Sequence, residues 1–362
     1  MSLPGPGAVD LLKIDGSTGE GGGQIVRLAL FLSLIKGTPV ELFNIRLGRK
    51  NPGLKRQHLH VIEALEAITG SRCQGARLGS TTIRFFPGPI KGGRVRIDFG
   101  TAGSIPLFLQ TLLPVVLFAS NPVELTVIGG TDVPMGPTME FIRHLYMPFL
   151  APLASRLEVK VIRRGFYPVG GGEVRLVCHP KKARHAFSWE EFLDYIRVFG
   201  PIEAGLWDTP GPGGVSVASS SLKERRVAHR QAQRAVGLLE ERLSEAPSIE
   251  IVYQPSASPG SAITLWFKDP HRTLGADALG ARGKSAERVA QEAAERLLDE
   301  YTSGAEVDRH LADHLVPWVG LRGGRIKVSR VTLHLETSLW LYDLMVPERP
   351  VRLEGEILKG PW

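Results

Sequence analysis

The sequence has little cysteine and no long apolar run. Cys73 and Cys178 are the two cysteines among 362 residues. They lack metal-ligand spacing, so we expect ordinary cytosolic thiols. No apolar stretch approaches the roughly 20 residues that a membrane-spanning helix needs, so we predict no contact with a membrane. The opening residues, MSLPGPGAVDLLK, lack the basic start and apolar core of a secretory signal. We therefore predict a cytoplasmic protein.

Basic residues outnumber acidic ones. The sequence holds 44 lysines and arginines against 37 aspartates and glutamates, which gives a net charge of +7. Five of the basic residues lie between Arg46 and Arg56. Such a surface suits a polyanion such as nucleic acid. Charge alone leaves two alternatives open: a phosphate-binding groove, or the solvated surface of an arginine-rich, thermally robust protein.

The first half of the chain repeats itself. Ile14-Asp15 recurs at Ile97-Asp98, and the Pro-Val-Glu-Leu of residues 39–42 recurs at residues 122–125, a shift of 83 in both cases. Each copy predicts a strand, a glycine-rich turn, an apolar helix, a strand, a loop, an amphipathic helix and two closing strands. The repeat therefore predicts an α/β fold built from βαβαββ units.

The helices of these units are predicted from residue spacing. Leu59, Ile62, Leu65 and Ile68 recur at three-residue intervals, which is typical of one helical face. The first helix of each unit is apolar on nearly all sides, so we expect it to be buried in the interior.

The repeat breaks near residue 184, and a chain of this length can hold two domains or one large domain with an insertion. Residues 185–273 predict a small α/β module, with a charged helix over 221–246 and strands over 248–255 and 262–269. Residues 208–221, DTPGPGGVSVASSS, are interpreted as a soft connecting stretch without regular structure. We predict a main domain formed by residues 1–184 and 274–362, whose last part is a degenerate third copy.

The stretch DGSTGEGGGQIVR, residues 15–27, combines a glycine run with the start of a helix. It lacks the ending of a P-loop and the spacing of a dinucleotide-binding turn. Glu20 in this loop is a candidate ligand for a divalent cation, or an acid favoured by the helix dipole. Gln110 is polar within an apolar helix, so it must find a buried partner or point into a site.

Histidines provide the candidates for covalent chemistry. His334 follows a predicted strand and precedes a predicted helix, where a side chain can project into a cleft. A neutral imidazole is a competent nucleophile toward phosphorus. The alternative is a surface or capping histidine. His310 and Asp313 lie on one helical face, which fits a metal site or an ordinary helix surface.

Taken together, several segments resemble the RNA 3′-terminal phosphate cyclases. The resemblance runs from about residue 12 to residue 345, and its segments occur in the expected order. They are IDGSTGEGGGQIVR, IRLGRKNPGLKRQHL, GTAGSIPLFLQTLLP, GGTDVPMGPTMEFIR, RRGFYPVGGGEV, HLADHL and VTLHLETS. The resemblance implies three βαβαββ units like the C-terminal domain of translation initiation factor three, with a thioredoxin-like α/β module inserted in the third.

The resemblance also implies an activity. Members of this family convert an RNA 3′-phosphate into a 2′,3′-cyclic phosphate, consume ATP, and release AMP and diphosphate. A histidine carries AMP as a covalent intermediate, and the matching residue is His334. The implied partners are ATP, Mg²⁺ or Mn²⁺, and RNA with a 3′-phosphate end. The sequence leaves the oligomeric state open, including a homo-oligomer.

The family's site residues map onto this sequence by motif. Glu20 would bind the metal. The phosphate- and RNA-binding positions are Arg27, Arg46, Arg49, Arg56 and Gln57. The nucleotide-pocket positions are Gln110, Pro137, His310, Leu311, Ala312, Asp313 and His314. Other cyclases can have tyrosine at the position of His310 and glutamine at that of His314, so the contacts to the base could differ here.

Three other functions compete with this interpretation. A non-enzymatic branch of the superfamily, which acts in ribosome assembly, lacks the nucleophilic histidine that His334 matches. Enolpyruvyl transferases share the repeated architecture. They need lysine- and arginine-bearing motifs in both halves of the chain, and we do not find these motifs. A pure RNA-binding module would explain the charge, but neither Gln110 nor His334.

Overall fold

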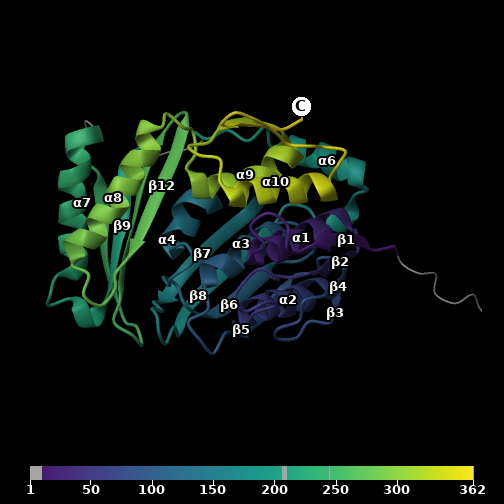
Figure 1. The fold of residues 1–362 in the computed structure, drawn as a ribbon, viewed down its shortest axis with the longest axis horizontal. Coiled ribbons are helices and arrows are strands. Elements are labelled where there is room, and N and C mark those ends of the chain that lie inside the picture. Colours follow the sequence, from purple (N-terminus) through teal and green to yellow (C-terminus); the bar gives the residue numbers. More distant parts are fainter. Residues whose placement is uncertain (1–9, 206–209, 244, 362) are drawn as a thin grey trace, which may run out of the picture.

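The computed structural model describes residues 10–205, 210–243 and 245–361. It is a mixed α/β structure with several sheets, which confirms the α/β part of the predicted fold. A large body and a smaller lobe are visible in Figure 1. The lobe contains α7 (Val227–Leu243), α8 (Ala286–Thr302), β9 (Gly211–Ser219) and β12 (Arg272–Leu279). Within the described ranges, no helix combines the length and apolarity needed to cross a bilayer.

The first sheet of the body is formed by residues 12–86. β1 and β2 are parallel, whereas β4 runs antiparallel to both β2 and β3. Two helices accompany the sheet, α1 (Gly23–Lys36) and α2 (Arg56–Thr69). The helix predicted from the spacing of Leu59 to Ile68 is thus confirmed. In spatial order the strands are β1 (Leu12–Asp15), β2 (Val40–Phe43), β4 (Ile83–Phe86) and β3 (Arg72–Gln74).

The second sheet has the same order and strand directions as the first. Its first helix is α3 (Ile105–Val116), and a π-helical turn (Ile142–Tyr146) separates α4 (Met139–Phe141) from α5 (Met147–Leu150). Such turns are rare and often mark functional sites. The strands are β5 (Gly93–Asp98), β6 (Val123–Gly129), β8 (Gly172–Pro180) and β7 (Ala154–Arg163).

The C-terminal part of the body adds a small antiparallel sheet and two long helices. The helices are α9 (Arg309–Arg322) and α10 (Leu333–Met345). The sheet consists of β13 (Arg325–Lys327), β15 (Ile357–Lys359) and β14 (Arg352–Glu354). α6 (Trp189–Arg197) also belongs to the body, because Phe192 and Ile196 are part of the main hydrophobic core.

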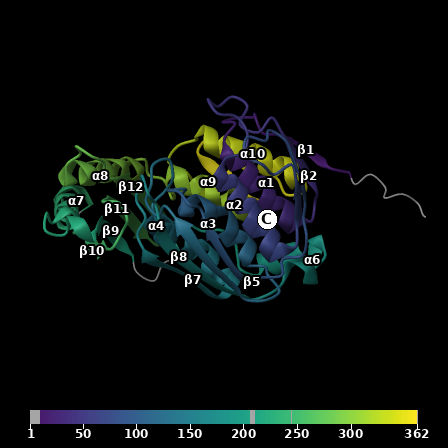
Figure 2. The same cartoon turned by 90° about the horizontal axis from the view of Figure 1, so that it is seen from below.

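The lobe is one four-stranded sheet covered by two helices. α7 (Val227–Leu243) and α8 (Ala286–Thr302) lie on one face of the sheet, as Figure 2 shows. On the other face, Trp266 stacks on His144 of the body, with ring centroids 4.6 Å apart. The strands are β10 (Ser248–Gln254), β9 (Gly211–Ser219), β11 (Ser261–Asp269) and β12 (Arg272–Leu279).

The lobe differs from the predicted module in three respects. α6 lies within the predicted bounds 185–273 but packs in the core of the body. The predicted boundary at residue 273 falls inside β12, and α8 packs on this sheet although it follows that boundary. Residues 208–221 were interpreted as a connecting stretch without regular structure. This interpretation is wrong for residues 211–219, because they form the buried strand β9. Residues 208 and 209 lie outside the described residues.

Helix α1 is buried as predicted. Nine of its 14 residues are buried, and the helix packs against α2, α3 and α10. The N-terminus of α1 is thereby held beside the first turn of α10, although the two helices are far apart in the sequence.

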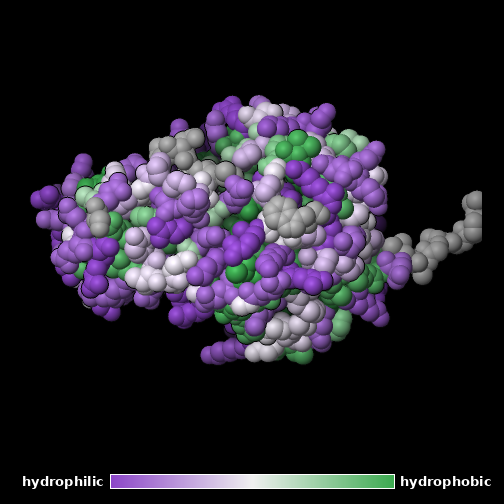
Figure 3. Space-filling model, turned by 90° about the horizontal axis from the view of Figure 1, so that it is seen from above, coloured by the Kyte–Doolittle hydropathy of each residue, from purple (hydrophilic) through white to green (hydrophobic). Residues whose placement is uncertain are grey.

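Most of the exposed surface seen from above is hydrophilic, with scattered apolar residues (Figure 3).

Candidate functional site

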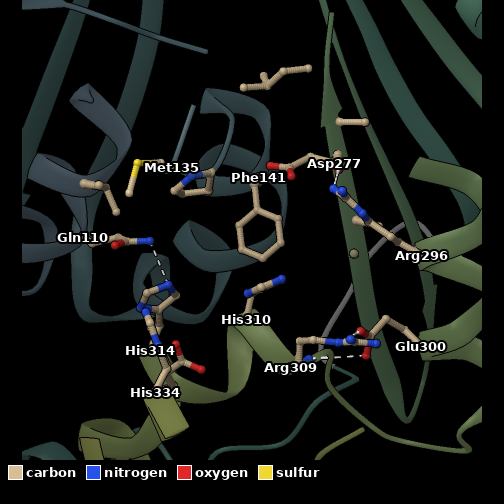
Figure 4. Close-up of a pocket in the computed structure, with 18 of the residues that line it drawn as sticks. Gln110, Met135, Phe141, Asp277, Arg296, Glu300, Arg309, His310, His314 and His334 are labelled. Atoms are coloured by element: carbon tan, nitrogen blue, oxygen red, sulfur yellow. Dashed lines mark hydrogen bonds and ion pairs between the residues drawn. The ribbon is translucent and has the colours of Figure 1, made fainter. Parts of the chain in front are cut away.

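A cavity of about 550 Å³ lies between the body and the lobe. The body contributes residues from α1, α3, α4, α9 and α10, and the lobe contributes residues from β12 and α8 (Figure 4). This volume is in the range of small-molecule sites. Seven of the residues predicted from the sequence line it: Arg27, Gln110, Pro137, His310, Asp313, His314 and His334.

His334 lies at the edge of the cavity, in the first turn of α10. Its side chain is 49% exposed, and its Nδ1 atom lies 3.2 Å from Oε2 of Glu20. The N-cap residue Thr332 fixes this turn by accepting a hydrogen bond from the amide of Leu335. A carboxylate at Nδ1 favours the tautomer with its proton on that nitrogen, which leaves the lone pair of Nε2 free.

The glycine loop before α1 brings Glu20 to this position. Gly19 and Gly21 have φ angles of +57° and +59°, which favour glycine on either side of the glutamate. The Glu20 amide donates a hydrogen bond to Thr337 Oγ1 at 3.1 Å. A Cβ atom on Gly19 would lie 2.3 Å from the same hydroxyl, so the close contact between the loop and α10 requires glycine.

Arg27 lines the cavity from the second turn of α1. Burial lowers the pKa of its guanidinium to about 10, against the opposing effect of Glu20, so it is still a cation at neutral pH. Among the residues that the structure describes, no side chain forms a hydrogen bond or an ion pair with this guanidinium. A half-buried cation that faces a cavity without a partner is suited to an anionic ligand.

Gln110, the polar residue of an apolar helix, has a hydrogen-bond partner and also faces the cavity. Its side-chain amide donates to Nε2 of His314 at 2.8 Å. Burial, reinforced by Arg27, His310 and His334, lowers the pKa of His314 to about 3. The ring of His314 is therefore neutral, and its Nε2 atom is a hydrogen-bond acceptor.

The N-terminus of α9 places His310 in the cavity. The N-cap residue Asp308 accepts hydrogen bonds from the amides of His310 and Leu311, each at 2.9 Å. Burial lowers the pKa of His310. Figure 4 shows His310 and Phe141 pointing toward one another across the cavity. Both rings can offer contacts to a flat aromatic ligand.

The predicted basic groove lies beside Glu20 and does not line this cavity. Arg49 donates to the backbone carbonyl of Glu20 at 3.0 Å and forms an ion pair with its carboxylate. Arg46 donates to the carbonyls of Asn51 and Gly53.

Four other predicted residues do not line the cavity either. Arg56 is exposed at the start of α2, and Gln57 is partly buried. Leu311 and Ala312 are fully buried in the core, so the structure does not bring them to the cavity. Of that segment, the residues that line the cavity are His310, Asp313 and His314, which share one face of α9.

Several residues of the site were not predicted. Gln24 donates to the His334 carbonyl at 3.0 Å and to Ser338, and so fixes α10 against α1. Its position, four residues after Glu20 in the same motif, is the signal that could have identified it. Phe141 has the pattern of a core residue. The lobe residues Lys284 and Arg296 gave no signal, because only the fold brings α8 to the cavity.

A resident metal cage is not formed by the protein alone. In the described part of the chain, no group of three or more histidine, cysteine, aspartate or glutamate side chains could hold an ion. Glu20 supplies one carboxylate beside the cavity. Mg²⁺ is commonly bound by one or two carboxylates together with substrate phosphates and water. The site therefore fits an ion that arrives with a phosphate ligand.

The arrangement combines a nucleophile, cations and a base-sized cavity. His334 offers a free Nε2, Arg27 offers positive charge, and Phe141 with His310 offers aromatic surfaces. These groups are suited to the transfer of a nucleotidyl group, which requires alignment of an in-line attack and stabilisation of phosphate charge.

Known proteins that are similar to this chain share one description. A family described as RNA 3′-terminal phosphate cyclase matches residues 18–349. The RNA 3′-terminal phosphate cyclase of Ignicoccus hospitalis is 40% identical over 356 residues, which cover 96% of each chain. That of Thermococcus onnurineus is 42% identical over 356 residues, 96% of this chain and 97% of the relative. That of Pyrococcus furiosus is 41% identical over 335 residues, 92% of both.

Proposed function

This chain belongs to the RNA 3′-terminal phosphate cyclase family, and we propose that it is an ATP-dependent cyclase that works through a histidine–AMP intermediate. The relatives' names support the cyclase activity. The contact between His334 and Glu20 at the edge of the cavity carries the proposal for the mechanism.

In the first step, Nε2 of His334 attacks the α-phosphorus of ATP. A P–N bond forms, the bond to the β-phosphate oxygen breaks, and diphosphate leaves. The ring gains positive charge as the bond forms, and the Glu20 carboxylate at Nδ1 stabilises that charge. Arg27 contributes a second fixed charge, which attracts the phosphate oxygens.

The adenine is held at the other end of the cavity. Phe141 and His310 offer it aromatic contacts, while Pro137 completes the wall. The neutral rings of His310 and His314 add no positive charge near the base, because burial lowers the pKa of both. A divalent ion bound by Glu20 and the phosphates would neutralise negative charge on the leaving diphosphate.

The RNA end binds on the Glu20 side of His334, where Arg46 and Arg49 lie. An oxygen of the RNA 3′-phosphate attacks the AMP phosphorus, and the P–N bond to His334 breaks. The neighbouring ribose 2′-hydroxyl then attacks the activated 3′-phosphorus, loses its proton and expels AMP. The product is a 2′,3′-cyclic phosphate.

The same proposal covers the origin of the fold and the location of the protein. We infer that the two sheets of identical order are copies of one βαβαββ unit, that the β13–β15–β14 part is a degenerate third copy, and that the lobe is a thioredoxin-like insertion. His334 argues against the non-enzymatic branch, which lacks the nucleophilic histidine. We also infer a cytoplasmic location, which suits an RNA substrate.

Labelled ATP tests the function directly. The wild-type protein, incubated with α-labelled ATP and Mg²⁺ or Mn²⁺, should form an acid-labile, alkali-stable protein–AMP adduct. RNA that ends in a 3′-phosphate should discharge the adduct and release the label as AMP, whereas RNA with a 3′-hydroxyl should leave the adduct intact. Discharge by both kinds of RNA end alike would argue against a cyclase, and absence of the adduct would argue against the mechanism.

A further inference from the structure

A buried ionic cluster lies beneath the segment that forms one wall of the cavity. At its centre is Arg164, which directly follows β7 and whose side chain is 2% exposed. Its Nη1 atom lies 3.1 Å from the Asp132 carboxylate, and its Nη2 atom pairs with the carboxylate of Glu140. Its Nε donates to the side-chain oxygen of Gln254 on lobe strand β10 at 2.9 Å. One guanidinium thus joins three separate parts of the chain.

The two carboxylates bracket the segment 132–140, which carries residues of the cavity wall. Asp132 also accepts a hydrogen bond from the amide of Met139 at 3.2 Å, which closes the segment into a loop. Met135 and Pro137 in this loop line the cavity, and Phe141 follows its end. Met135 has a φ angle of +67°, and its side chain is 96% exposed. Such a strained conformation requires firm support from its surroundings.

The lobe holds the same segment from the other side. The Thr138 amide donates to Oδ2 of Asp277 at 2.8 Å, and the hydroxyl of Thr138 lies 2.6 Å from that of Thr264. Asp277 itself lines the cavity. The segment is therefore fixed between the lobe and the Arg164 cluster, and Arg164 contacts the lobe as well through Gln254.

We propose that Arg164 is a positioning residue for the nucleotide pocket, which fixes the segment 132–140 against the lobe in the conformation that receives the nucleotide base. This inference rests on the proposed function, because it takes ATP as the ligand of the cavity. Arg164 does not line the cavity, so it acts through Met135, Pro137 and Phe141.

Electrostatics explain why an arginine is needed here. The side chains of Asp132 and Glu140 are at most 1% exposed. Burial alone would raise the pKa of Glu140, but His144, Arg164 and Arg143 outweigh it and lower the pKa to about 2. Without Arg164, Glu140 would keep Arg143 and His144. The buried Asp132 carboxylate would lose the cation that pairs with it, and the segment would have to open to hydrate it. A lysine keeps the charge but cannot donate in a planar fork to three partners.

The test compares Arg164→Lys with Arg349→Lys. Arg349 is also buried, and it donates to the carbonyls of Gly320 and Pro361, each at 2.9 Å. It is a matched control because its hydrogen bonds lie outside the segment 132–140. Both variants should lose thermal stability. Only Arg164→Lys should raise the KM for ATP, by about 10-fold, with kcat at saturating ATP and the KM for RNA unchanged.

A second variant keeps the test decisive if Arg164→Lys does not fold. Gln254→Ala removes the lobe contact and leaves both buried ion pairs, so it should raise the KM for ATP by about threefold.

Three results would overturn the inference. These are wild-type KM values for ATP in the folded Arg164→Lys and Gln254→Ala proteins, an equal rise in Arg349→Lys, and a loss confined to kcat. Failure of the wild-type protein to form the adduct would instead contradict the proposed function.

Discussion

The Glu20 carboxylate is predicted to accelerate formation of the histidine–AMP adduct through its contact with His334. The change Glu20→Gln keeps the size of the side chain and removes its charge. As Nε2 bonds to phosphorus, the ring becomes cationic at a distance of 3.2 Å from the carboxylate. Two unit charges at that distance attract by about 5 kcal/mol at an effective dielectric constant of about 20.

Solvent reduces this energy, because the side chains of His334 and Glu20 are 49% and 22% exposed. We expect about 2 to 3 kcal/mol to remain in the transition state, a loss of about 100-fold in the adduct-forming rate. Rapid-quench measurement of a single turnover with α-labelled ATP gives this rate. Saturating ATP and metal separate it from any loss of metal affinity.

A matched control exists on α2. Glu63 lies 3.2 Å from Nδ1 of His60, the same contact at the same distance, but neither residue lines the cavity. Glu63→Gln should therefore form the adduct at the wild-type rate. A Glu20→Gln protein that is folded and reacts as fast as Glu63→Gln would refute the electrostatic role of Glu20.

Three further changes probe the cavity. Arg27→Met should slow adduct formation by about 100-fold, whereas Arg27→Lys, which keeps the charge, should lose less; equal rates in the two would remove Arg27 from the site. His314→Gln should form the adduct within a few fold of the wild-type rate, because glutamine can still accept the Gln110 hydrogen bond. His314→Leu should lose about 10-fold in that rate, and the reverse order of the two variants would contradict the role of His314 as a hydrogen-bond acceptor. Burial, reinforced by Glu300, raises the pKa of Asp308 from 3.8 to about 7 against three backbone hydrogen bonds, so the folded protein keeps a proton that the unfolded chain loses. The free energy of unfolding of the wild-type protein should therefore fall relative to that of Asp308→Asn as pH rises from about 4 to about 7. The fall, measured by urea unfolding, should be up to about 4 kcal/mol. A difference that stays constant with pH would show that Asp308 is ionised.

The regular parts of the body could be predicted because their patterns are local. The three-residue spacing from Leu59 to Ile68 is a property of one helix, and α2 contains all of it. The lobe strand β9 was missed because its first half consists of glycine and proline, which are typical of turns and loops. A Cβ on Gly213 would lie 2.5 Å from Nε1 of Trp266, and one on Gly275 in β12 would lie 2.1 Å from Leu145. These glycines reflect close packing, which local sequence does not reveal.

The site was predicted as a set of motifs and not as a geometry. The resemblance pointed to both Glu20 and His334, which are more than 300 residues apart, but their contact depends on the packing of α1 against α10. Phe141 was missed because an aromatic residue in an apolar helix has the pattern of core. Conversely, the motif that contains Leu311 and Ala312 suggested pocket residues, but the helical period turns both toward the core.

The site of adenylylation tests the central claim most directly. The wild-type protein, trapped with ATP and Mg²⁺ under alkaline conditions and digested, should yield by mass spectrometry one peptide that carries AMP, with the modification on His334. The folded His334→Ala protein should yield none. AMP on another residue, or a modified peptide of unchanged yield from His334→Ala, would contradict the account.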